Sequence, residues 1–169
     1  MNLEVITREP LERRFETPLL FVHRTGHAAW CWDENFLPFF AERGFSSHAL
    51  SLRGHGSSDG ADKLKWTRIA DYVADVRQAA MQLARPPVLI GHSLGGLVVM
   101  KCLETYEAPA AVLVAPCPSE GMFRSGFKSQ MRNPLLMAKV ALKQDYAVMF
   151  STPQLAKRFC FQSMQMIFW

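Results

Sequence analysis

The sequence has no histidine after residue 92, and it has very few acidic residues in its last third. The five histidines stand at positions 23, 27, 48, 55 and 92. After Glu107, only Glu120 and Asp145 carry a carboxylate. The last third of this sequence can therefore supply no imidazole base, and at most two carboxylates, to a site that the rest of the chain builds.

Cysteines are few and long apolar runs are missing. The four cysteines, at positions 31, 102, 117 and 160, show no short-range pairing and no metal-ligand spacing, which predicts free thiols and no metal site. No apolar run approaches the roughly 20 residues that cross a bilayer. The first residues have neither the basic lead nor the apolar core of a secretory leader. These features predict a cytoplasmic protein without a membrane span.

The net charge of +4 is also unevenly spread, because most of the excess of lysine and arginine lies after residue 118. These basic residues recur at helical spacing, which favours a solvated helix face over an anion-binding patch. No basic patch is interleaved with stacking aromatic residues, and no glycine-rich phosphate loop follows an apolar run. We therefore expect no nucleic-acid partner and no cofactor.

Apolar runs of strand length alternate with helical patterns through the first two thirds of the chain. Buried strands are predicted at 18–23, 45–52, 87–90 and 110–115, and a short edge strand near residues 3–7. Helices are predicted at 30–43, from a cap at Thr67 to about residue 84, and from residue 94 to about residue 106. This alternation predicts an α/β fold with a mostly parallel sheet and flanking helices. The functional site of such a sheet lies at the carboxyl ends of its strands.

One of these predicted strands leads into the motif Gly91-His92-Ser93-Leu94-Gly95-Gly96. An apolar run precedes the motif and a helical pattern follows it, so Ser93 is predicted at the tip of a strand–turn–helix junction. Gly-x-Ser-x-Gly in this setting is typical of a nucleophile elbow, where glycines allow a strained turn and close packing. The alternative is a glycine-rich helix start at which the serine is only an N-cap.

Two further segments appear in the same order, Val22 to Trp32 and Leu50 to Ser58. Together with the elbow, they make residues 18–118 resemble the α/β-hydrolase superfamily, in particular its esterase- and lipase-like serine hydrolases. The resemblance implies that residues 1–118 form the N-terminal part of the hydrolase core. Residues 119–169 are similar in position and composition to the beginning of the helical cap, with short helices at about 123–131, 134–150 and 153–162.

The resemblance assigns roles to individual residues. Ser93 would be the nucleophile, and the backbone N–H groups of Leu94 and Thr25 would form the oxyanion hole. Other residues near the site would be structural, namely His23, His55, His92, Gly91 and Gly95.

The sequence departs from the family pattern at two points. Arg24 stands where the family commonly has glycine, so its side chain is expected to crowd the oxyanion loop. The family also places its acid and histidine after the serine, in the order Ser, Asp or Glu, His. This chain has no histidine there, and we expect neither His23 nor His55 to replace it. The chain thus resembles the front part of a longer enzyme in which the late strands are missing.

These observations leave three hypotheses. The first is a serine hydrolase that cleaves an ester or similar acyl bond of a small apolar substrate but is inactive as this chain alone. The second is a non-catalytic small-molecule-binding member of the same fold. The third is a truncated or frameshifted gene product, because residues 164–169 form an apolar end without a cap or turn. In that case, the exposed edge of the strand at 110–115 is expected to cause self-association.

Overall fold

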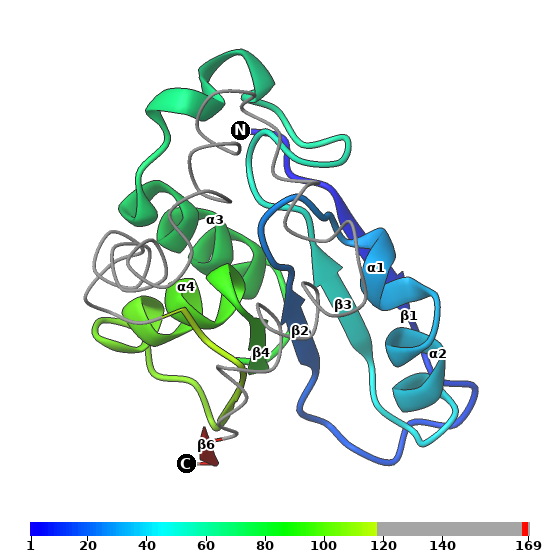
Figure 1. Ribbon diagram of the computed structural model, residues 1–169. Coiled ribbons are helices and arrows are strands. Elements are labelled where there is room, and N and C mark those ends of the chain that lie inside the picture. The colour runs from blue at the N-terminus through cyan, green and yellow to red at the C-terminus, as the bar shows by residue number, and fades with distance from the viewer. Residues whose placement is uncertain (118–166, 169) are drawn as a thin grey trace, which may run out of the picture. The chain divides into compact units, whose positions relative to one another are not determined.

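The computed structural model describes residues 1–117 and 167–168. Six strands form one mixed, mostly parallel sheet in the order β1-β3-β2-β4-β5-β6, with helices on its faces (Figure 1). The parallel strands are β2 (Leu19–Val22), β3 (Ser47–Leu50), β4 (Val88–His92) and β5 (Ala111–Val114). The edge strands β1 (Val5–Arg8) and β6 (Ile167–Phe168) run antiparallel to their neighbours. The predicted fold class is confirmed, whereas the helices predicted at 123–131, 134–150 and 153–162 lie outside the described residues.

The strand β2 is the centre of this sheet, and all four of its residues are buried. Because successive side chains point to opposite faces, Leu20 and Val22 pack into one apolar cluster, and Leu19 and Phe21 into another. Full burial of each such side chain contributes about 1.5–3 kcal/mol to folding. The continuous apolar run at 18–23 thus reflects a strand whose side chains are buried on both faces of the sheet, as predicted.

Two pairs of helices cover these faces. The cluster of Leu20 and Val22 includes residues of α3 (Ile69–Met81) and α4 (Leu94–Leu103), and the cluster of Phe21 includes residues of α1 (Trp30–Asp33) and α2 (Phe36–Ala41). Figure 1 shows these pairs on opposite sides of the sheet. Within residues 1–117, none of the helices has both the length and the apolar character that a bilayer crossing requires.

The single helix predicted at 30–43 is two short helices in the structure. The break falls at Asn35, whose φ of −139° is not helical. Pro38 is the reason, because a helix running through it would need the N–H that proline lacks and would bring its ring against the carbonyl of residue 34. The sequence-based prediction was wrong here because it followed the apolar spacing and ignored the proline.

The predicted cap at Thr67 was also wrong. The structure places the N-cap of α3 at Arg68, whose backbone N–H donates to Asp71 Oδ2 at 2.8 Å. Thr67 instead ends a 3-10 helix, η1 (Ala61–Trp66), and its hydroxyl donates to the Lys63 carbonyl. The sequence pattern gave no indication of this short helix, since its turns are too few to show a period.

The strand at 110–115 was expected to expose an unpaired edge. In the structure, β6 pairs with β5 at two positions, Val112 with Phe168 and Leu113 with Ile167. The apolar end of the sequence therefore supplies part of the missing edge partner. Self-association remains a prediction.

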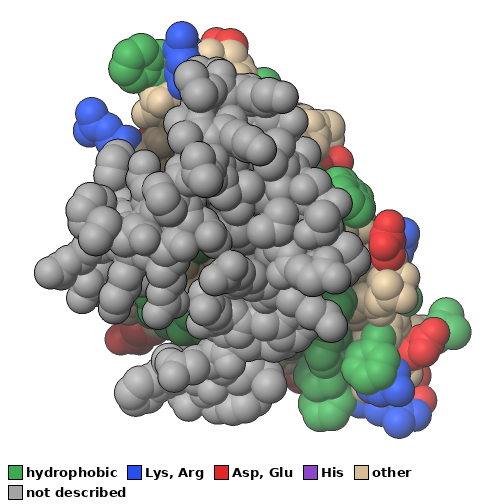
Figure 2. All heavy atoms as spheres, in the orientation of Figure 1, with side chains coloured by type: hydrophobic (Ala, Val, Ile, Leu, Met, Phe, Trp, Pro, Cys, Tyr) green, Lys and Arg blue, Asp and Glu red, His purple; other side chains and the backbone are tan. Residues whose placement is uncertain are grey.

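Exposed aromatic side chains lie on α1 and α2, namely Trp30, Phe36 and Phe39. The Arg43 guanidinium covers the Phe39 ring, with Cζ 3.5 Å from the ring centroid. Figure 2 shows hydrophobic and charged side chains mixed along the edge that is not drawn in grey. Charged neighbours of this kind interrupt the apolar surface, which limits its tendency to associate.

Candidate functional site

Ser93 occupies a sharp turn between β4 and α4. Its φ of 54° and ψ of −112° lie in a region that side chains rarely adopt. The Ser93 N–H donates to the Val114 carbonyl at 2.9 Å, and the Leu97 N–H donates to the Ser93 carbonyl at 3.2 Å. Ser93 stands at the N-cap of α4, but its hydroxyl makes no capping hydrogen bond to the helix. A serine held in a strained turn without a capping role fits a functional site better than a plain helix start.

Glycines allow this turn to pack closely against the sheet. A Cβ on Gly95 would lie 2.6 Å from the His23 carbonyl oxygen, and one on Gly91 would lie 2.7 Å from the Gly96 nitrogen. No side chain fits at either position, because the atoms it would meet belong to the backbone. The first turn of α4 therefore lies directly against the carboxyl end of β2, where the Thr25 loop begins.

The two N–H groups predicted for the oxyanion hole lie on these adjoining segments. Leu94 is the first residue of α4, so its N–H has no acceptor within the helix. Thr25 is exposed, and its N–H makes no backbone hydrogen bond within the described residues. Within the part of the chain that the structure describes, neither N–H makes a backbone hydrogen bond, and a helix N-terminus such as that of Leu94 favours developing negative charge.

Arg24 does not have a positive φ, the backbone feature that would call for glycine. The described residues with positive φ include Gly26 but not Arg24, so position 24 needs no glycine for its backbone. The Arg24 guanidinium turns instead to His27, with Nη2 3.0 Å from His27 Nε2. A φ constraint at position 24 is thus excluded, and the expected crowding of the oxyanion loop by the Arg24 side chain stays a prediction.

His23 is fully buried, and both of its ring nitrogens have partners. Nδ1 donates to the Arg24 carbonyl at 2.8 Å, and Nε2 accepts from the Leu52 N–H at 3.0 Å. The pKa of His23 is lowered from 6.5 to about 4, chiefly by burial and also by the charges of His55 and His27, whereas the hydrogen bond to the Arg24 carbonyl and the Glu4 charge raise it. His23 thus joins the end of β2 to the segment after β3 as a neutral ring.

The ring signals of His23 in an NMR pH titration are expected to stay constant between about pH 8 and about pH 5. The unfolded chain takes up a proton near pH 6.5, but the folded chain does so only near pH 4. The contribution of His23 to the stability of the fold is therefore complete above about pH 6.5. It declines as the pH falls from there toward about 4. A midpoint near 6.5 for His23 would contradict the burial of its ring.

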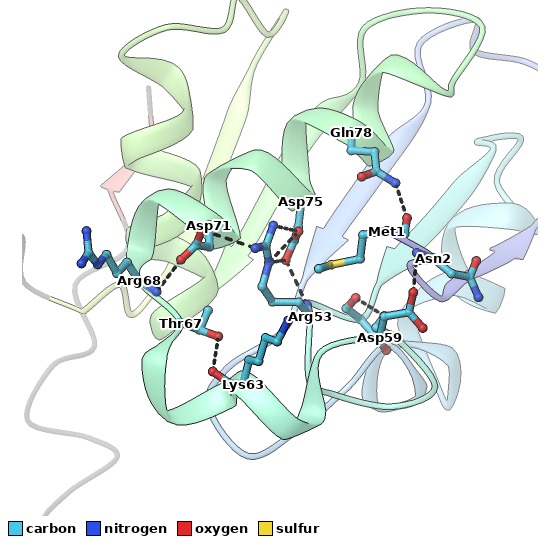
Figure 3. A network of polar contacts seen from close by, with 12 residues as sticks. Met1, Asn2, Arg53, Asp59, Lys63, Thr67, Arg68, Asp71, Asp75 and Gln78 are labelled. Atoms are coloured by element: carbon cyan, nitrogen blue, oxygen red, sulfur yellow. Dashed lines mark hydrogen bonds and ion pairs between the residues drawn. The ribbon is translucent and has the colours of Figure 1, made fainter.

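His55 belongs to the loop after β3, which is fastened to α3. The His55 ring lies 5.0 Å from the His23 ring, and its Nδ1 contacts the Arg53 carbonyl at 3.0 Å. Arg53 reaches Asp75 at 2.6 Å and Asp71 at 3.3 Å (Figure 3). Asp75 is only 1% exposed, and its hydrogen bond raises the pKa of Arg53. A buried carboxylate paired in this way holds the loop in one position beside the site.

His92 lies next to Ser93 in sequence, but its ring contacts Trp32 of α1, with the ring centroids 6.4 Å apart. Burial lowers the pKa of His92, and the Arg24 charge lowers it further. The remaining histidine, His48, is bonded to Thr7 and Ser46 at the amino end of β3. The structure thus gives each of the five histidines a contact with a residue other than Ser93.

The sequence reasoning missed the residues that anchor the loop after β2. The Ser51 hydroxyl accepts from the Ala29 N–H at 2.8 Å and donates to the Glu4 carboxylate. This hydrogen bond is the largest cause of the lowered pKa of Glu4. Only the place of Ser51 at the carboxyl end of a predicted strand could have indicated such a role. Among the described residues, no group of three or more histidines, cysteines and acids could hold a metal ion.

Comparison with known proteins links this geometry to enzymes. The model of the alpha/beta hydrolase family matches residues 19–165. The probable esterase PIR7A of Oryza sativa subsp. indica is 33% identical over 108 residues, which are 60% of this chain and 40% of the rice protein. A putative esterase/lipase of Haemophilus influenzae is 34% identical over 88 residues, which are 47% of this chain and 30% of that protein. The chain thus spans well under half the length of these relatives.

Solved structures show the same arrangement of elements. A Paleococcus ferrophilus monoacylglycerol lipase superposes with a TM-score of 0.59 and 26% identity, over 69% of this chain and 44% of the lipase. A thioesterase domain from the curacin biosynthetic pathway gives a TM-score of 0.57 at 21% identity, over 68% of this chain and 40% of that domain. The thioesterase match supports the fold alone.

Proposed function

Because the chain belongs to the alpha/beta hydrolase family, we propose that it is the site-bearing part of a serine hydrolase that cleaves an ester or similar acyl bond of a small apolar substrate. Ser93 is the nucleophile, and the N–H groups of Leu94 and Thr25 bind the oxyanion. The single observation that carries this proposal is the strained turn at Ser93, with φ of 54°, between a buried strand and its helix. The esterases and lipases among its relatives support the substrate class.

The same proposal includes a limit on activity. A serine hydroxyl is a weak nucleophile until a base takes its proton. This sequence has no histidine after Ser93, and His23 has no lone pair to offer because Nε2 already accepts from the Leu52 N–H. We therefore expect this chain alone to hydrolyse esters slowly, with only the oxyanion hole and binding to accelerate the reaction.

An alkyl fluorophosphonate, supplied with imidazole as an external base, tests the proposal. The reagent is expected to form one adduct, which mass spectrometry of the digested protein assigns to the peptide containing Ser93. Protein unfolded in urea is the control, since its serines lack the oxyanion donors and are expected to stay unlabelled. An adduct at another residue, or none at all, would remove Ser93 from the role of nucleophile.

A non-catalytic binding protein of the same fold is the second candidate. It is supported by the Arg24 side chain beside the predicted oxyanion loop. Such a protein would bind a small ester without turnover, whatever base is added. The labelling experiment therefore separates the two candidates.

A further inference from the structure

Arg24 carries a positive charge that the described part of the chain does not neutralise. Six of the arginines in this part pair with a carboxylate: Arg8, Arg13, Arg14, Arg43, Arg53 and Arg85. Within residues 1–117 and 167–168, Arg24 has no ion pair, and its hydrogen bonds all go to His27. Among these residues, no carboxylate competes with a ligand for its charge.

The partner of Arg24 orients the guanidinium without cancelling its charge. Three contacts of 3.0–3.3 Å join Arg24 nitrogens to the imidazole nitrogens of His27. Burial and the Arg24 charge lower the pKa of His27, so this ring is neutral near pH 7 and can accept a hydrogen bond. The His27 ring is in turn stacked on Trp30, with centroids 5.4 Å apart and an angle of 18° between the planes. The neutral His27 ring, held by its stacking on Trp30, fixes the direction of the Arg24 side chain. Other N–H groups of the guanidinium remain for an anion.

The place of Arg24 brings this charge to the site of reaction. Its neighbour Thr25 supplies one of the proposed oxyanion donors, and the carbonyl of its other neighbour, His23, touches the first turn of α4 at Gly95. The Arg24 charge also lowers the pKa of His92, which precedes Ser93. An anionic group bound by Arg24 would thus lie beside the loop that carries one of the proposed oxyanion donors.

We propose that Arg24 is a substrate-recognition residue that binds a carboxylate, and that the preferred substrates are half-esters, in which an apolar spacer separates this carboxylate from the ester. This inference rests on the proposed function, because it places the ester of the same molecule at Ser93. Arginine suits the task because its planar fork can bind both oxygens of a carboxylate. This inference narrows the proposed substrates from small apolar esters in general to those that also carry one carboxylate.

Binding of a matched pair of ligands tests this assignment without depending on turnover. In the Ser93→Ala protein, which cannot cleave the ester through Ser93, the dissociation constants of monomethyl glutarate and dimethyl glutarate are measured by NMR, following the indole N–H of Trp30. The two ligands differ in the free carboxylate. We expect the half-ester to bind about tenfold more tightly or better, which is the usual effect of one charge-assisted pair, and added salt to reduce the preference.

Variants at position 24 assign the preference to one side chain. Arg24→Gln in the same background is expected to bind both ligands equally, and Arg24→Lys to keep part of the preference, since it keeps the charge but not the fork. Arg77→Gln is the matched control, because Arg77 also lacks a carboxylate partner within residues 1–117 but lies on α3, where it donates to Thr105. It should keep the full preference.

Two results would overturn the assignment. One is equal or undetectable binding of both glutarate esters by the Ser93→Ala protein, and the other is a preference that survives Arg24→Gln. The failure of the proposed function looks different, since it appears as the absence of fluorophosphonate labelling at Ser93. A protein that prefers the half-ester but is not labelled would keep the anion site and lose the hydrolase assignment.

Discussion

Imidazole is expected to raise the rate at which an alkyl fluorophosphonate labels the protein by about a hundredfold, and Ser93→Ala to remove the whole of this increase. A positioned general base contributes about 10²–10⁴ in rate, and a base in free solution recovers only part of it. The increase requires an oxygen nucleophile beside the oxyanion donors, and Ser93 is the residue whose strained turn provides one. The measurement is the labelling rate against imidazole concentration at constant pH and ionic strength.

The imidazole is essential to this comparison because the members of a catalytic triad act as a unit. Once the base is missing, removal of the serine changes the rate little further, so Ser93→Ala without imidazole would be uninformative. Ser57→Ala is the matched control, since Ser57 is an exposed serine on the loop after β3 and should leave the increase unchanged. An increase that persists in Ser93→Ala would show that imidazole activates some other group.

The strands and the order of the motifs could be predicted from the sequence because burial on both faces leaves an unmistakable pattern. The apolar run at 18–23 contains β2, and the run at 110–115 contains β5. The strand–turn–helix junction at Ser93 could also be predicted from the sequence, because its glycines mark a tight turn. In the structure, a Cβ at position 91 or 95 would collide with backbone atoms. Local chemistry determined these features, so no knowledge of distant contacts was needed.

The errors have other causes. The break at Asn35 follows from Pro38, which a prediction from apolar spacing alone does not register. The cap at Arg68 depends on which of several competent residues makes the first hydrogen bond, and apolar spacing does not contain that choice. The pairing of β6 with β5 joins residues more than fifty positions apart, which a pattern of short period cannot indicate.

Long-range polar contacts were the least predictable part of the candidate site. Arg24 was predicted only as a departure from glycine, although its effect depends on where the guanidinium goes, and His27 decides that. The anchoring of the loop by Ser51, Glu4 and Ala29 joins three segments of the sequence. Such contacts follow from the fold, and they could be found only once the fold was known.

Gly95→Ala is expected to destabilise the folded protein by about 3 kcal/mol, even though alanine is the better helix former. In an open helix, this substitution would gain about 1 kcal/mol. Here, the new Cβ would lie 2.6 Å from the His23 carbonyl oxygen, which belongs to the backbone at the end of the central strand β2 and cannot move aside. The overlap must therefore separate α4 from β2, which also moves Leu94 away from the Thr25 loop. Urea unfolding followed by circular dichroism measures the loss.

Gly96→Ala is the matched control for this prediction, because it changes the neighbouring residue of the same helix. Its Cβ would lie 2.9 Å from the Cβ and 3.0 Å from the Cα of Pro116, after the end of β5, and 3.2 Å from the Gly91 carbonyl oxygen, so its overlaps are milder than those at Gly95. A shift of a few tenths of an ångström relieves most of that overlap, so the loss should be about 1 kcal/mol after the gain in helix propensity. Gly95→Ala should therefore unfold at clearly lower urea than Gly96→Ala. Equal midpoints, or a Gly95→Ala protein as stable as the original, would mean that the first turn of α4 does not rest on the end of β2, and the oxyanion donors would then have no common site.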